Sequence, residues 1–169
     1  MANRMYKLLF SPRGRIGRGP FLAGLAFLIL FVLFQKTIWP WLGTGMAAFF
    51  VPMILFFVTF HIMLCLFGKR LHDIGRSLWP FTGLMAFMIV MFLVVMLKYG
   101  GLEYFNTVMA HPEYADRPDE MRRVAETYQA ALKAGLPQAR VLMAIPPLLF
   151  TLWLAVRPGE SGPNAYGPA

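Results

Sequence analysis

Long apolar runs separated by short polar connections dominate the chain. Residues 19–35, 37–68, 77–97 and 141–156 contain no Asp, Glu, Lys or Arg. A helix that crosses a hydrocarbon core of about 30 Å needs about 20 mostly apolar residues. The pattern therefore predicts an all-α polytopic membrane protein whose four transmembrane helices occupy about residues 21–39, 46–67, 78–97 and 141–156.

Two of these spans are either interrupted by polar residues or short, so their flanking residues must help them cross the bilayer. The first must run past Gln35 and Lys36, whose ammonium can extend to the interface near Trp39 and Trp41. The fourth is short and contains Pro146-Pro147, which predicts a kink. Both remain long enough to cross a bilayer with some local adjustment.

The polar segment at residues 98–138 separates the third and fourth spans. Within it, residues 118–134 predict one short amphipathic helix, since Pro118 suits a first helical position and acidic residues follow it. Gly135, preceded by Lys133, predicts the end of that helix. We expect the helix to lie on the membrane or on the other helices, with a partner-binding helix as the alternative.

Composition and charge narrow the class further. The chain is 58% hydrophobic and 14% charged, whereas soluble domains average about 25% charged residues. A soluble enzyme and a disordered chain are both excluded, and residues 1–169 are expected to form a single membrane domain. A net charge of +8 would suggest nucleic acid in a soluble protein, but here it is better explained by membrane topology, so no nucleic acid is expected.

The basic residues also predict orientation. Five precede the first span, whereas only Lys36 follows it directly; the five are Arg4, Lys7, Arg13, Arg15 and Arg18. Because basic flanks stay on the cytoplasmic side, we predict cytoplasmic N- and C-termini and an extracytoplasmic 98–138 segment. The first span is expected to remain uncleaved, although its flanks loosely imitate a secretory signal. Cys65, the only cysteine, excludes an intrachain disulfide.

The connection between the second and third spans carries the most informative polar residues. Lys69 and Arg70 would complement the negative end of the second helix, and Ser77 could cap the third. His72 and Asp73 have no such role. We expect Asp73 to pair with Arg70 or Arg76 and thereby hold the connection together.

Three ordered motifs resemble those of the domain-of-unknown-function 805 family. They are Gly-Arg-Ile-Gly-Arg at residues 14–18, Arg-Leu-His-Asp-Ile-Gly-Arg-Ser at residues 70–77, and Gly-Pro-Asn-Ala-Tyr-Gly-Pro at residues 162–168. Gly17 and Leu78 depart from the family pattern, and the 98–138 segment is longer than is typical. The resemblance implies a small polytopic protein of the bacterial inner membrane, without a settled biochemical activity.

Under the predicted topology all three motifs lie on the cytoplasmic side. We expect one polar cluster formed by Arg15, Arg18, Arg70, His72, Asp73, Arg76, Asn164 and Tyr166. Either these groups satisfy one another, or their basic donors bind an anion such as an anionic lipid head group. The sequence thus predicts a non-catalytic structural or regulatory module, with membrane lipids as partners and a protein partner or a second copy of the chain as further possibilities. Arg15, Arg70 and Arg76 are the residues hypothesised to form the basic binding face.

Other chemistry receives less support from the sequence. His72 and Asp73 supply only two metal ligands, and His111 and Glu113 fall on the opposite side, so neither a metal nor any other cofactor is expected. No arrangement indicates a catalytic nucleophile with its base. The alternative function is a small transporter or proton-coupled permease using His61, which lies inside the second span.

Overall fold

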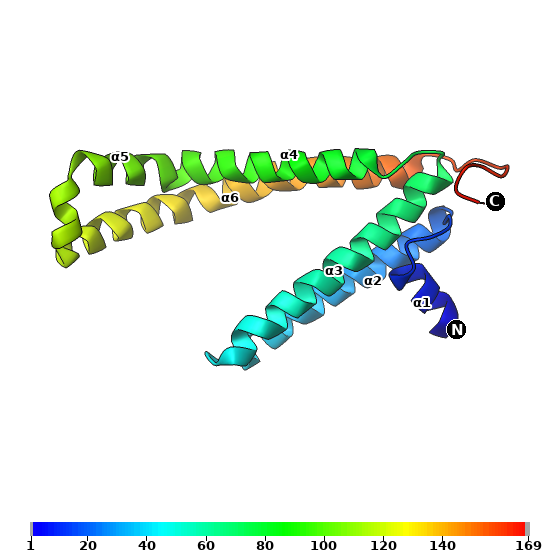
Figure 1. The fold of residues 1–169 in the computed structure, drawn as a ribbon, viewed down its shortest axis with the longest axis horizontal. Helices are drawn as coiled ribbons and strands as arrows, with labels where there is room; N and C mark the ends of the chain where they lie inside the picture. Colours follow the sequence, from blue (N-terminus) through cyan, green and yellow to red (C-terminus); the bar gives the residue numbers. More distant parts are fainter. Residues whose placement is uncertain (1, 168–169) are drawn as a thin grey trace. The chain divides into compact units, whose positions relative to one another are not determined.

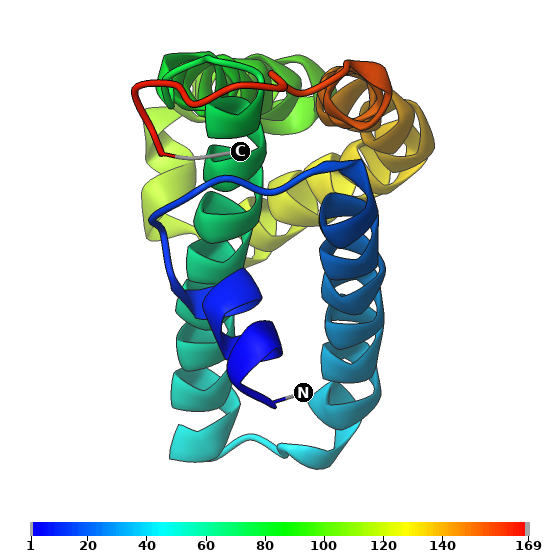
Figure 2. The same cartoon turned by 90° about the vertical axis from the view of Figure 1, so that its right-hand side faces the viewer.

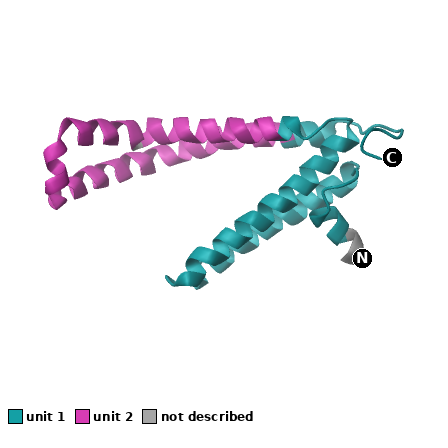
Figure 3. Ribbon diagram, in the orientation of Figure 1, with its two compact units in different colours: residues 1–81, 151–169 teal, residues 82–150 magenta. Residues whose placement is uncertain are grey.

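The computed structural model describes residues 2–167, and it is helical apart from its connections and one isolated antiparallel bridge between Asn164 and Gly167. Met1, Pro168 and Ala169 lie outside the described residues. The chain divides into two compact units (Figure 3), one formed by residues 1–81 with 151–169 and the other by residues 82–150. The all-α polytopic class predicted from the sequence is confirmed.

The first unit is built on a hairpin of α2 (Arg18–Ile38) and α3 (Met46–Asp73), which lie side by side (Figure 1). A short 3₁₀ turn, η1 (Trp39–Trp41), follows α2 directly. Gly24 of α2 faces the Leu66 side chain so closely that an added Cβ would overlap it. This small residue therefore allows the two helices to approach closely.

A short helix that the sequence pattern did not predict precedes this hairpin. Helix α1 (Ala2–Phe10) packs against α3 (Figure 2), where its Leu9 is buried with Ile62 and Leu28. With about two and a half turns, such a helix is marginal in isolation, so its packing on α3 supplies most of its stability. Its exposed side includes Met5 and Tyr6.

The second unit contains the segment between the third and fourth spans. Helix α4 (Trp79–Met96) begins in the first unit, passes through a π-helical turn, η2 (Leu97–Gly101), and continues as α5 (Leu102–Ala110). A 3₁₀ turn, η3 (Pro112–Asp116), reverses the chain into α6 (Pro118–Val156), whose last residues belong to the first unit. Tyr99 donates to Gln138 at 3.3 Å, and the Thr107 and Tyr128 hydroxyls lie 3.1 Å apart.

The predicted start at Pro118 is confirmed, but the predicted end before Gly135 is wrong. Helix α6 runs without interruption for 39 residues into the fourth span. Gly135 does not adopt the positive φ that usually ends a helix at glycine. Instead it is buried against the Tyr99 ring, where an added Cβ would overlap, so here glycine serves helix packing rather than termination.

Four helical stretches are long and apolar enough to cross a membrane: Arg18–Trp41, Met46–Asp73, Trp79–Tyr99 and Pro118–Val156. Only 6% to 17% of the most apolar window in each is buried inside the protein. Their large apolar side chains therefore face outward, as expected for helices solvated by lipid. The second span extends beyond its predicted limit at residue 67, because α3 continues to Asp73.

Candidate functional site

Arg70 lies in the last turns of α3 and is completely buried. Its Nε donates to the Leu154 carbonyl at 2.9 Å, and its Nη2 donates to the Arg157 carbonyl. Its Nη1 donates to the Asp73 carboxylate and, at 3.5 Å, to the Ile16 carbonyl. Every nitrogen of the guanidinium thus has an acceptor, as a buried cation requires.

Asp73, at the end of the same helix, connects Arg70 to the N-terminal loop. Its carboxylate pairs with Arg70 and lies 3.5 Å from an Nη atom of Arg15. Its carbonyl accepts a 2.8 Å hydrogen bond from the Glu160 amide. One carboxylate therefore serves two buried arginines.

Arg15 reaches from the N-terminal loop to the C-terminal segment. Its Nη1 donates to the Gly162 carbonyl at 2.7 Å and to the Gly167 carbonyl at 3.3 Å, while its Nη2 donates to the Glu160 carbonyl. Only 3% of its side chain is exposed. Its Nε is buried without an acceptor among the described residues.

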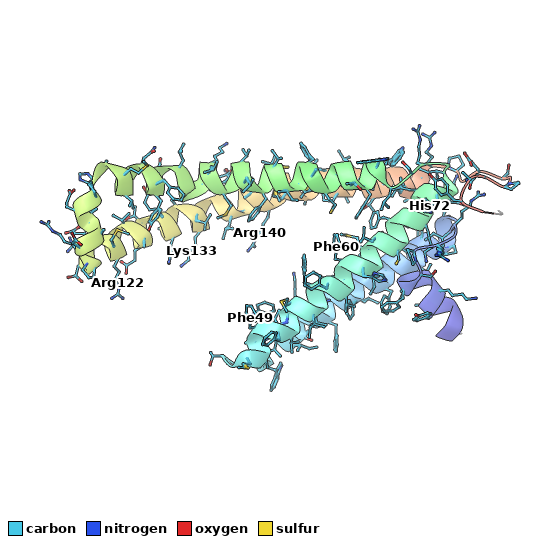
Figure 4. The ribbon with its side chains drawn as sticks, viewed as in Figure 1. Phe49, Phe60, His72, Arg122, Lys133 and Arg140 are labelled. Carbon is cyan, nitrogen blue, oxygen red and sulfur yellow. The ribbon has the colours of Figure 1, made fainter. Side chains whose placement is uncertain are left out.

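The third motif closes over the end of α3. Asn164 donates from Nδ2 to the His72 carbonyl at 2.9 Å and to the Glu160 carboxylate at 2.7 Å, and its Oδ1 accepts from the Tyr166 amide. The Tyr166 ring stacks on the His72 imidazole with centroids 4.0 Å apart. His72 lies at the end of α3 (Figure 4), with Nδ1 3.4 Å from the Gly14 carbonyl.

These contacts define one clasp that joins three distant segments, formed by Arg15, Arg70, His72, Asp73, Glu160, Asn164 and Tyr166. Six of these are residues that the sequence singled out. The other two predicted members lie at its edge: Arg18 is exposed and donates to the Arg157 carbonyl at 3.3 Å. Arg76 is exposed, and its side chain makes no hydrogen bond or ion pair within residues 2–167.

Two glycines contact acidic side chains of the clasp, and the sequence pattern does not indicate these contacts. Gly75 has φ of +68°, and a Cβ there would overlap the Glu160 carboxylate. A Cβ at Gly159 would overlap the carboxylate of Asp73. The acidic side chains therefore lie directly against backbone, which only glycine permits at this spacing. Glu160 itself was missed because nothing near it in the sequence indicates a partner.

A second group of contacts holds α1 to α3. Lys69 is 2% exposed, and its ammonium donates to the Lys7 and Leu8 carbonyls at 2.7 and 2.5 Å. His61 Nε2 lies 3.1 Å from the Phe10 carbonyl. Both side chains thus satisfy carbonyls left open at the C-terminal end of α1. The sequence pattern places Lys69 near the end of α3 but does not indicate α1.

Polar groups elsewhere in the spans are also partnered. Gln35 donates from Nε2 to the Thr59 hydroxyl at 2.8 Å, and that hydroxyl donates to the Leu55 carbonyl. His61 has the Cys65 sulfur as its other polar neighbour, at 3.5 Å. Gln35 and Thr59 therefore hold α2 to α3, as interhelical hydrogen bonds do in membranes.

In the second unit, His111 and Glu113 pair with each other at 3.0 Å. Hydrogen bonding to its own backbone amide, followed by the hydrogen bond from His111, lowers the pKa of the exposed Glu113 carboxyl. Within the described part of the chain, no group of three or more His, Cys, Asp or Glu side chains is placed to hold a metal.

The fold and clasp define a polytopic α-helical membrane protein whose N-terminal loop, α3 end and C-terminal segment share one polar centre. The family described as protein of unknown function (DUF805) matches residues 9–168, nearly the whole chain, and the protein belongs to that family. This confirms the resemblance drawn from the three motifs. Searches among curated proteins and among solved structures found no match.

Proposed function

We propose that this protein is a non-catalytic structural or regulatory module of the bacterial inner membrane, with both termini cytoplasmic. Its clasp holds the terminal segments in place, and the exposed basic side chains around the clasp bind anionic lipid head groups. The alternative occupants of this surface are a protein partner and a second copy of the chain.

The environment of Arg70 is the observation that carries the proposal. A guanidinium that is completely buried and bonded to three carbonyls and a carboxylate links α3 to both terminal segments and has no exposed donor for a ligand. The Arg15 side chain is 3% exposed, and both of its Nη atoms are bonded within the protein, which leaves only its Nε without an acceptor among the described residues. Of the hypothesised face of Arg15, Arg70 and Arg76, only Arg76 is exposed. We therefore assign the lipid contacts of this face to exposed arginines instead of Arg15 and Arg70.

The exposed arginines bordering the clasp are Arg18, Arg76 and Arg157. All lie near span ends, at residues where α2 begins, α3 has just ended and α6 has just ended. Each basic residue near an anionic leaflet contributes about 1 kcal/mol of attraction. A cytoplasmic position for these residues would therefore favour phosphatidylglycerol over zwitterionic lipid.

Native mass spectrometry of the full-length protein, with equimolar phosphatidylglycerol and phosphatidylethanolamine, tests this function. We expect preferential retention of phosphatidylglycerol, weakened by Arg18→Gln with Arg76→Gln. Arg122→Gln, an exposed variant on α6, is the matched control and should change nothing. Equal retention of both lipids by the wild-type protein would overturn the proposal.

The proposed orientation has its own test. Reporter fusions at residues 110 and 169 should report opposite compartments, with residue 169 in the cytoplasm. The hydrogen bond between Arg15 and the Gly162 carbonyl supports a shared side for the N-terminal loop and the C-terminal segment, and with it an even number of spans. The same compartment for both fusions would contradict the proposed topology.

A further inference from the structure

A small basic pocket lies where the end of α1, the following loop and α3 meet. It has a volume of about 250 Å³ and is lined by Lys7, Leu8, Arg13, Arg15, Ile16 and Lys69. Four of these six residues are cationic, and none of the six is acidic. It is smaller than the roughly 300–1,000 Å³ sites that hold drug-sized ligands, so it suits a compact anionic group.

Lys69 is the first reason to expect an anion there. The ammonium has three donors, of which two are used by the Lys7 and Leu8 carbonyls. No Asp or Glu pairs with Lys69 in the part of the chain that the structure describes. A cation that is 2% exposed and lacks a counter-ion is costly unless a ligand supplies the negative charge.

Arg15 supplies an independent second observation. Its two Nη atoms donate to the C-terminal segment and Asp73, but its buried Nε has no acceptor among the described residues. Within the described residues Arg15 forms an ion pair only with Asp73, whose carboxylate is shared with Arg70. Two buried cations bordering one pocket thus each retain an unused donor, whereas buried donors are normally satisfied.

The pocket is also accessible. Lys7 and Arg13 are exposed, and Arg13 makes no hydrogen bond or ion pair within residues 2–167. Beside them, α1 presents exposed Met5, Tyr6 and Phe10. Basic residues next to exposed apolar ones are typical of a helix lying in a membrane interface. This combination favours an amphipathic ligand with an anionic head.

We propose that this pocket binds a phosphate group, with Lys69 and Arg15 as inner donors and Lys7 and Arg13 at the rim. The phosphate is that of an anionic lipid head group or of free inorganic phosphate, and the test separates these sources. The inference rests on the proposed function, because it gives the lipid one defined site beyond the exposed arginines near the clasp.

The test is a ³¹P NMR titration of delipidated, full-length protein in detergent, using short-chain phosphatidylglycerol or inorganic phosphate. We expect one phosphate-bearing molecule bound per protein. Losing a charge-assisted hydrogen bond in Lys69→Met should weaken binding about tenfold or more, and removing the rim charge in Arg13→Gln should weaken it about twofold to fivefold. Arg122→Gln is the control and should bind like wild type.

Each outcome of this titration either supports or overturns the proposed phosphate pocket. Lys69→Met also loosens α1. The Arg13 side chain is exposed and makes no hydrogen bond or ion pair within residues 2–167, so Arg13→Gln tests the proposal in a protein that still folds. Binding of inorganic phosphate alone with this variant pattern supports the pocket and assigns it free phosphate. Lipid binding that responds to Arg18→Gln and Arg76→Gln, but not to Lys69→Met and Arg13→Gln, would leave the proposed function standing and overturn the pocket. Failure of both probes would overturn it as well.

Discussion

The Arg70 guanidinium donates to the Asp73 carboxylate from one turn earlier on the same helix, and both side chains are buried. This pair sits at the end of α3, where Arg15 approaches the same carboxylate from the N-terminal loop. The N-terminal loop and the C-terminal segment both bind to the charged side chains at this helix end. The stability of this arrangement depends on opposite charges that compensate one another away from water.

The two side chains of this pair should contribute to stability non-additively. We predict that Arg70→Met or Asp73→Asn lowers the free energy of unfolding by about 3–5 kcal/mol, because each deprives a buried charge of its nearest partner of opposite charge. In the double variant the loss should be smaller than the sum of the two single losses. The measurement is unfolding in detergent by SDS titration, followed by tryptophan fluorescence.

The control for this prediction is Arg122→Gln, which removes an exposed pair with Glu126. Exposed pairs contribute about 0–1 kcal/mol, so its unfolding should be nearly unchanged. Strictly additive losses in Arg70→Met with Asp73→Asn would show that the two side chains do not interact.

The close approach of the C-terminal segment to Asp73 predicts a sharp difference between two glycines. Gly159→Ala should destabilise the clasp by about 1–3 kcal/mol, since its Cβ would overlap the Asp73 carboxylate. Gly162→Ala should be tolerated, because among the described residues no atom beyond its chain neighbours lies within 4 Å of a Cβ there. Limited proteolysis of the C-terminal segment measures both. Equal protease sensitivity of the two variants would contradict the observed packing.

The ring of Tyr166 should matter more than its hydroxyl. Stacked aromatic pairs contribute about 0.5–1.5 kcal/mol beyond buried area, so Tyr166→Ala should lower stability by at least that amount. Tyr166→Phe should behave like wild type, because the hydroxyl makes no hydrogen bond within residues 2–167 while the ring still stacks on His72. Chemical-shift changes of the His72 ring report the contact. A defect in Tyr166→Phe would point to a role for the hydroxyl.

Glu113 predicts a small pH effect in the second unit. Its folded pKa lies below the ordinary value, so its contribution to the η3 turn is present above the unfolded pKa. That contribution is lost as the pH falls through the lowered folded pKa. NMR titration of the side-chain carboxyl should show a midpoint below the ordinary value for a glutamate side chain. A midpoint at or above that value would contradict the contact with His111 and the backbone.

The sequence predicted the spans because their signal is local. An apolar run of sufficient length has few alternatives to a membrane helix, whatever the rest of the chain does. The end of α6 was misjudged at Gly135 because the cause lies in another element, the Tyr99 ring packed against it. Helix α1 was missed for the same reason, since its stability comes from Leu9 packing on α3.

In the candidate site, too, the sequence predicted the residues with a local signal and missed those that depend on contacts with other elements. The motifs identified Arg15, Arg70 and Asp73, because charged residues beside a span must find partners. Which arginine is buried could not be predicted, because Arg70 and Arg76 look alike in the sequence and differ only in what surrounds them. The role of Lys69 depends on its contact with α1, and that of Glu160 on its contact with Gly75. The residues around Lys69 and Glu160 in the sequence indicate neither contact.

Arg15 of the N-terminal loop holds the C-terminal segment in place. A thermodynamic cycle between Arg15→Gln and deletion of residues 158–169 measures this directly, with SDS unfolding as the readout. Because Arg15 donates to the carbonyls of Glu160, Gly162 and Gly167, we predict a coupling energy of at least about 1 kcal/mol. Losses that add to within about 0.5 kcal/mol, as for independent sites, would contradict the account.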